Sequence, residues 1–170
     1  MKSITMCEDY NINSDGMIRI LTNQKYYDYL TSVTQDINSS HITFLKEDSQ
    51  FIYMKLTNNL SLELPEFLNI FSNFSNSKIV ESYKIDKLNK VITININSEI
   101  LNKGSCKCYC LFTLKDIAEN KVSTAFTLSC ECSLPLISNK VEDAICTKTF
   151  EKNKIKIRNV ANYIEKFCKL

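Results

Sequence analysis

The chain has 170 residues, 44% of them hydrophobic and 24% charged, which is enough for one globular domain spanning residues 1–170 with a single core. A formal net charge of +2 offers no broad cationic surface to a phosphate backbone, so nucleic acid is not an expected partner. No stretch approaches the roughly 20 apolar residues of a membrane span and no signal peptide is visible, so we expect a soluble, cytoplasmic protein.

Hydrophobic periodicity predicts seven strands, two helices between the first two strands, and a long helix after the last strand. Alternating or apolar runs predict strands at residues 4–10, 41–46, 50–56, 78–85, 91–101, 105–114 and 122–134. Between the first two strands, Asn13 and its neighbours cap a helix over residues 16–21, and a second helix follows Asn23. The buried face of that second helix is predicted to hold Tyr26, Tyr27, Leu30 and Val33.

The later strands each have one apolar face, because side chains on a strand alternate between two sides. Those faces hold Ile92, Ile94, Ile96 and Ile100, then Cys106, Cys108, Cys110, Phe112 and Leu114, then Val122, Phe126, Leu128, Cys130, Cys132 and Leu134. One apolar and one polar face indicate an antiparallel sheet covered on a single side. The cover is a helix from Ser138 to about Cys168, with a predicted inward stripe of Ala144, Ile145, Ile157, Ala161, Ile164 and Cys168.

Two segments resemble the START-like, or SRPBCC, helix-grip superfamily. Residues 14–27 (SDGMIRILTNQKYY) are similar to the segment after the first strand in these proteins. Residues 133–142 (SLPLISNKVE) resemble the junction before the last helix in START-like bacterial domains of unknown function and VASt sterol-binding domains, with Ser138-Asn139 in place of the usual Gly-Gly. The resemblance implies an α+β helix-grip fold: a curved antiparallel sheet of about seven strands, two short helices after the first strand, and a long C-terminal helix across the concave face.

The helix-grip resemblance implies a cavity between the sheet and the last helix. We therefore expect non-enzymatic binding, and in addition transfer, of a lipid, sterol or other hydrophobic small molecule, without a cofactor. The residues expected to line the cavity are Glu81, Tyr83, Ile92, Ile94, Ile96, Cys108, Cys110, Phe112, Phe126, Leu128, Cys130, Ile145 and Ile164.

Three alternative functions stay open. Residues 64–71, followed by residues 77–100 and the terminal helix, bear a fainter resemblance to PRELI-like phosphatidic-acid carriers. That resemblance implies phospholipid transfer with a small helical protein partner in the mitochondrial intermembrane space. A filled cavity would instead make a protein-interaction module, whose partner the sequence does not identify. A cyclase, hydratase or hydrolase would need a convergent acid and base, for which the inward faces supply Glu81 and one of Tyr26, Tyr27, Tyr53 or Tyr83.

Two titratable residues of the predicted strands, Glu81 and His41, do not indicate a catalytic site. Glu81 either meets a polar ligand head inside the cavity or pairs with a lysine at the rim. His41, the only histidine, begins a predicted strand with no nucleophile near it in sequence, which indicates a surface residue. No catalytic residue is therefore assigned.

The eight cysteines are expected to be reduced thiols. Five of them, Cys106, Cys108, Cys110, Cys130 and Cys132, fall on one face of two neighbouring strands. Cys-x-Cys lacks the Cys-x2-Cys spacing of structural zinc sites, and a free cysteine behaves as a small buried hydrophobe. We expect these five to line the core or the cavity and assign no metal site, with metal or redox chemistry as the alternative.

Two surface features have both a binding and a structural interpretation. Helical spacing after Pro65 places Phe67, Leu68, Ile70 and Phe71 at the expected cavity mouth, as a lid with transient membrane contact or as a plug for the core. In the last helix, Lys148, Lys152 and Lys156 form a solvated face or meet anionic lipid headgroups.

Overall fold

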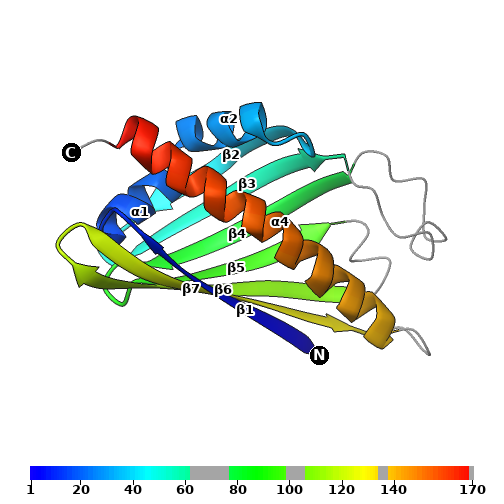
Figure 1. The fold of residues 1–170 in the computed structure, drawn as a ribbon. Coiled ribbons are helices and arrows are strands. Elements are labelled where there is room, and N and C mark those ends of the chain that lie inside the picture. The colour runs from blue at the N-terminus through cyan, green and yellow to red at the C-terminus, as the bar shows by residue number, and fades with distance from the viewer. Residues whose placement is uncertain (62–76, 99–105, 134–137, 169–170) are drawn as a thin grey trace.

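The computed structural model describes residues 1–61, 77–98, 106–133 and 138–168 (Figure 1). One antiparallel sheet contains seven strands in the order β1-β7-β6-β5-β4-β3-β2. The strands are β1 (Lys2–Tyr10), β2 (Ile37–Glu47), β3 (Phe51–Leu60), β4 (Ser77–Asp86), β5 (Val91–Ser98), β6 (Cys106–Ala118) and β7 (Lys121–Cys132). The helices are α1 (Ser14–Leu21), α2 (Gln24–Val33) and the 30-residue α4 (Ser138–Phe167).

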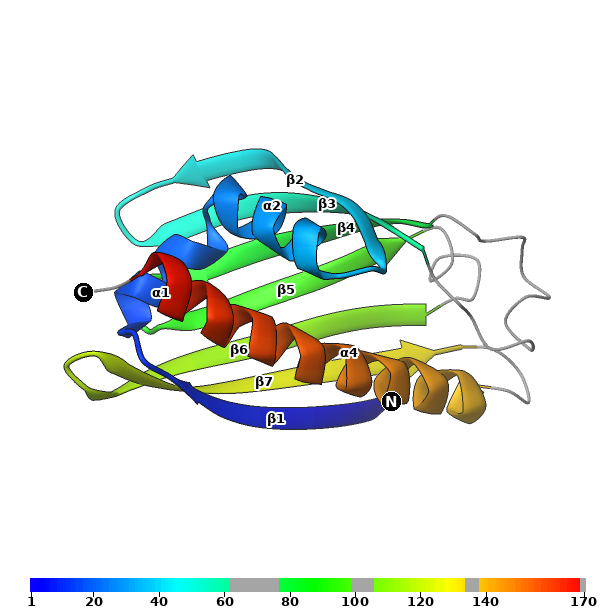
Figure 2. The ribbon, with the colours of Figure 1, turned by 45° about the horizontal axis from the view of Figure 1, so that its top comes forward.

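The predicted architecture is confirmed. The sheet curves around α4, and α1 and α2 lie near the C-terminal end of that helix (Figure 1). Figure 2 shows α4 crossing the sheet between β1 on one side and α2 on the other. The predicted helical segment at residues 64–71, together with Ile100 and Leu134, lies outside the described residues.

Burial alternates along the central strands as period two requires. On β6, Cys106, Cys108 and Cys110 are buried on the concave side, whereas Tyr109 and Leu111 are exposed on the other. Strand bounds are less well predicted. In particular, β6 runs to Ala118, through most of the loop expected at residues 115–121, because β6 and β7 continue to pair almost to their tight turn.

The inward side of α4 differs from the predicted stripe. Its buried apolar residues are Val141, Cys146, Val160, Tyr163 and Ile164. Ala161, predicted to face inward, is exposed, and that prediction is wrong. Positions 160 and 161 both follow Ile157 by about one helical turn, and the helix turns the larger apolar side chain, Val160, toward the sheet.

An aromatic cluster fixes α4 against α2. The ring of Tyr26 lies 5.1 Å from that of Tyr27 and 5.3 Å from that of Tyr163, both edge to face. Tyr29 adds a second contact with Tyr163, at 5.3 Å. Val33, predicted to share the buried face of α2, is instead exposed, because the helix ends there and leaves the cluster.

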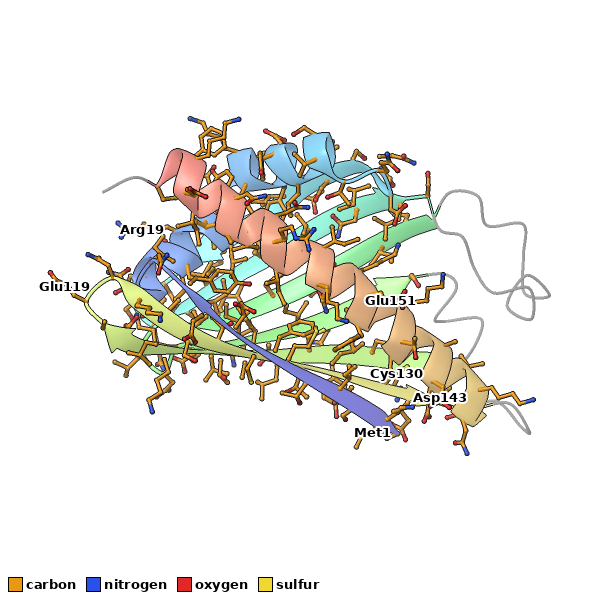
Figure 3. The ribbon with its side chains drawn as sticks, in the orientation of Figure 1. Met1, Arg19, Glu119, Cys130, Asp143 and Glu151 are labelled. Carbon is orange, nitrogen blue, oxygen red and sulfur yellow. A yellow bond between two sulfur atoms is a disulfide. The ribbon has the colours of Figure 1, made fainter. Side chains whose placement is uncertain are left out.

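The start of α4 is held against the ends of β1 and β7. The Cys132 backbone N–H donates to Glu142 Oε1 at 2.9 Å, and the N-terminal ammonium lies 3.3 Å from Glu142 Oε2. These contacts hold the pKa of Glu142 below its usual value. Figure 3 shows Met1, Cys130 and Asp143 at this same end of the molecule.

The five cysteines of β6 and β7 share one buried face, as predicted, but two of them are bonded. Cys106 and Cys132 oppose each other in the ladder, with Cα atoms 4.1 Å apart, and form a disulfide. The expectation that all eight thiols are reduced is therefore wrong for this pair. Cys108 and Cys130 form the next opposed pair, with sulfurs 3.2 Å apart. The described residues contain no group of three or more His, Cys, Asp or Glu side chains suited to a metal ion.

None of the helices in the described ranges is long and apolar enough to cross a membrane.

Candidate functional site

A cavity lies between the concave face of the sheet and α4. Its volume is about 80 Å³, and about 660 Å³ when the space open to solvent at its mouth is included. The smaller figure alone is several times the roughly 10–15 Å³ that one water molecule requires. It is below the roughly 300–1,000 Å³ of typical small-molecule sites, so an organic ligand bound there would also occupy the open mouth. The hollow can therefore accept an organic ligand that extends toward solvent.

The cavity wall is mainly apolar. It comprises Met6, Glu8, Tyr10, Met17, Leu21, Tyr26, Tyr83, Ile92, Ile94, Phe112, Thr124, Phe126, Asn153, Lys156, Ile157 and Val160. These residues come from β1, β4, β5, β6 and β7 of the sheet and from all three described helices. A few polar groups in an apolar wall are typical of sites that bind and orient a hydrophobic molecule.

Five of the residues predicted to line a cavity are brought together in this wall: Tyr83, Ile92, Ile94, Phe112 and Phe126. The other eight lie outside it. Cys108, Cys110, Leu128, Cys130 and Ile164 pack in the core, while Ile96, Ile145 and Glu81 are half-buried beside it. Ligand contact by any of these residues stays a prediction. Phe67, Leu68, Ile70 and Phe71, the predicted lid, lie outside the described residues.

No sequence pattern indicated the side of the wall built by β1 and α1. Met6, Glu8 and Tyr10 reach the cavity because β1 pairs with β7 at the edge of the sheet and runs beside α4. Met17 and Leu21 reach it because α1 closes the end near the C-terminus of α4. A helix was predicted over residues 16–21, but partner elements far along the chain decide which of its residues meet a hollow.

Two polar atoms of the wall are buried without a protein partner. The hydroxyl of Tyr26, whose side chain is 0% exposed, and the Nδ2 of Asn153 form no hydrogen bond with any described residue. Burial raises the pKa of Tyr26 well above its usual value, so its hydroxyl keeps its proton as a donor. Buried polar groups are ordinarily hydrogen-bonded, and both residues line the cavity, so a ligand bound there is a candidate acceptor for these two donors.

Two charged residues form the exposed rim of the cavity. Glu8 of β1 and Lys156 of α4 line it and are also exposed to solvent. In the described part of the chain, neither forms an ion pair. Lys156 is exposed, as a solvated face requires, and it also lines the cavity. Lys152 lies outside the wall, with its Nζ 3.3 Å from Asp36 Oδ2.

Glu81 belongs to a polar network beside the cavity. Its Oε1 accepts from Asn58 Nδ2 at 3.1 Å, and its Oε2 accepts a short hydrogen bond from the hydroxyl of Tyr83. The hydroxyl of Ser40 in turn donates to Asn58 Oδ1 at 2.5 Å. An amide and a phenol thus replace the rim lysine expected for Glu81. His41, on β2, is exposed, as predicted.

Comparison with known proteins shows similarity at the level of structure. No protein-family model matches the sequence, and no curated protein matches it. A START superfamily protein from Mycobacterium smegmatis matches 96% of this chain over 97% of its own, with a TM-score of 0.62 and 9% identity. The Zhui aromatase/cyclase from Streptomyces sp. R1128 matches 99% of this chain over 96% of its own, with a TM-score of 0.66 and 8% identity. Norcoclaurine synthase from Thalictrum flavum matches 97% of this chain over 87% of its own, with a TM-score of 0.65 and 8% identity. At these identities the matches show the fold alone.

Proposed function

We propose that this chain, which has the START-like helix-grip fold, binds a hydrophobic small molecule in the cavity between its sheet and α4. The observation that carries the proposal is the cavity itself, with a mainly apolar wall in which two buried donors have no described protein partner. The fold of its structural neighbours supports this, since three of them are a START superfamily protein, an aromatase/cyclase and a synthase.

Apolar burial would supply most of the binding energy. Removing apolar surface from water contributes about 25 cal/mol per Å², and the wall residues Ile92, Ile94 and Phe126 offer such surface to a ligand. Polar groups would orient the ligand and add modestly to the affinity. The hollow also gives the filled-module alternative no support, because a filled interior leaves no space between the sheet and α4.

Filling the cavity from α4 is expected to weaken binding. Val160→Phe adds volume on the cavity side of the helix, and we expect the affinity for the uncharged apolar dye N-phenylnaphthylamine to fall at least about tenfold. Because the added ring enters open space, the free energy of unfolding should change by less than about 1 kcal/mol, whereas overpacking a filled core costs about 1–3 kcal/mol. Fluorescence titration and urea unfolding measure the two quantities.

Ala161→Phe is the matched control, since residue 161 neighbours Val160 on the same helix but is exposed. It should leave dye affinity unchanged. Equal dye binding by the wild type and Val160→Phe would contradict the proposal, as would loss of stability in Val160→Phe on the scale of an overpacked core.

A second candidate function, catalysis in the same cavity, is favoured by one observation. Tyr83 lines the cavity, and its hydroxyl donates a hydrogen bond to the Glu81 carboxylate. A carboxylate and a phenol are therefore in direct contact next to the wall. Burial raises the pKa of Tyr83 well above its usual value, so the phenol would act as an acid or a donor rather than as a base. Its proton already points to Glu81, which lies outside the wall, so binding without chemistry remains the better supported proposal.

A further inference from the structure

We propose that the ligand is an apolar molecule with an anionic oxygen group, a carboxylate, that Asn153 and Lys156 hold at the mouth of the cavity. This inference rests on the proposed function and specifies the polar chemistry of the same site. It predicts that ligands with the same apolar tail bind with different affinities when their polar head groups differ.

The placement of the two residues on α4 supports a shared contact. Residues 153, 156, 157 and 160 recur at helical spacing and all line the cavity, so they form the one face of α4 that looks onto it. On this face Asn153 and Lys156 are polar, and they precede the apolar pair Ile157 and Val160. A ligand along this face would place its tail against the apolar pair and its head beside the polar pair.

The unpartnered groups inside the wall are donors, and donors require an acceptor. Asn153 Nδ2 can only donate, and the Tyr26 hydroxyl deeper in the wall retains its proton. Carboxylate oxygens accept several hydrogen bonds at once, and hydrogen bonds to a charged acceptor are stronger than those to a neutral one. An acceptor-bearing ligand therefore uses groups that no described part of the protein uses.

The charge of Lys156 favours an anion over a neutral acceptor. Burial raises the pKa of the Cys110 thiol to about 12, the Glu81 carboxylate adds to this rise, and the Lys156 ammonium opposes it. The charge of Lys156 is thus felt at the concave face of the sheet as well as in solvent. Glu8 stands on the β1 side of the same mouth and would favour a cation instead, so the sign of the preferred head is the decisive measurement.

Three ten-carbon probes with different heads test the inference: decanoic acid, decanol and decylamine, each used to displace N-phenylnaphthylamine at neutral pH. We expect the acid to bind about tenfold more tightly than the amine, with the alcohol between them. Lys156→Met should remove the preference of acid over alcohol. The control Lys152→Met, on the same helix but outside the wall, should retain it. Asn153→Leu should lower the affinity for the acid and for the alcohol by about fivefold each, since one hydrogen bond contributes about 1 kcal/mol.

The outcomes separate this inference from the proposed function. Equal affinity for all three heads, or tightest binding of the amine, overturns the carboxylate inference while apolar binding stands. Failure of every probe and of the dye to bind overturns both. A preference for the acid that persists in Lys156→Met overturns the assigned role of that residue.

Adjacent tyrosines give a variant pair that tests whether the Tyr26 hydroxyl is free to meet the ligand. Tyr27 is as deeply buried as Tyr26, but its hydroxyl donates to the Leu21 carbonyl at 2.6 Å. We expect Tyr26→Phe to leave the urea midpoint of unfolding unchanged and to weaken decanoate binding, whereas Tyr27→Phe should lower that midpoint because it loses a buried hydrogen bond. Equal destabilisation by both changes would show that the Tyr26 hydroxyl has a protein partner and would overturn its role.

Discussion

Removing the Cys106–Cys132 disulfide is expected to lower the free energy of unfolding by about 3–4 kcal/mol. The bond joins residues 26 positions apart, and cross-linking a loop of that length restricts the unfolded chain by about that amount. In a chain of this size, such a loss lowers the melting temperature by roughly 10 °C. Urea unfolding of the wild type and of a Cys106→Ala/Cys132→Ala double variant, both without reductant, measures the difference.

The exposed thiol Cys7 provides the control, since Cys7→Ala should leave stability unchanged and leave the disulfide intact. A reducing agent should bring the wild type to the stability of the double variant and should not affect the double variant itself. Finding eight reactive thiols in the unfolded, untreated protein would contradict the disulfide. So would equal stability of the oxidised wild type and the double variant.

Asp116→Ala should lower the free energy of unfolding by about 2 kcal/mol. The carboxylate of Asp116, near the end of β6, accepts from both the backbone N–H and the hydroxyl of Ser14, each at 2.6 Å. Ser14 begins α1 and is 0% exposed, and a carboxylate at a helix N-terminus is further stabilised by the helix dipole. Hydrogen bonds to a charged group contribute about 1.5–3 kcal/mol each, and the exposure of Asp116 reduces that figure.

The same change should weaken ligand binding, because α1 supplies Met17 and Leu21 to the cavity wall. Asp15→Ala is the matched control. Asp15 follows Ser14, and its exposed carboxylate pairs with Lys90 Nζ at 2.5 Å, a surface ion pair that contributes at most about 1 kcal/mol. Equal losses of stability in the two variants would show that Asp116 does not anchor α1.

The apolar faces of the strands could be predicted from sequence, but the pairing between strands could not. The predicted loop at residues 115–121 would end the hairpin with Leu114 opposite Val122, whereas the structure pairs Leu114 with Thr124. A shift of two residues leaves every side chain on its face, so the concave face was predicted correctly. It changes each partner across the ladder, however: the predicted register sets Cys106 opposite Cys130, whereas the structure sets it opposite Cys132. The disulfide itself was missed for another reason, since without a visible signal peptide the thiols were expected to be reduced.

The cavity wall could be predicted only in part, for two physical reasons. Periodicity identifies apolar positions, so Ile92 and Phe112 were found, but it ignores polar residues such as Asn153 and Lys156 on the same side of α4. The edge strand β1 joins the wall through its pairing with β7 at the far end of the chain. A contact between segments so far apart in the chain depends on the order of all seven strands in the sheet, which no local sequence pattern contains.

Intermolecular nuclear Overhauser effects between a bound apolar ligand and the protein test the central claim most directly. With isotope-labelled protein and bound decanoate, the account predicts contacts from the ligand methylene protons to Ile94, Phe112 and Val160 in the cavity wall. It predicts none to Leu111, the exposed neighbour of Phe112 on the outer face of β6. Contacts confined to the outer face, or saturable binding without any contact to the wall, would contradict it.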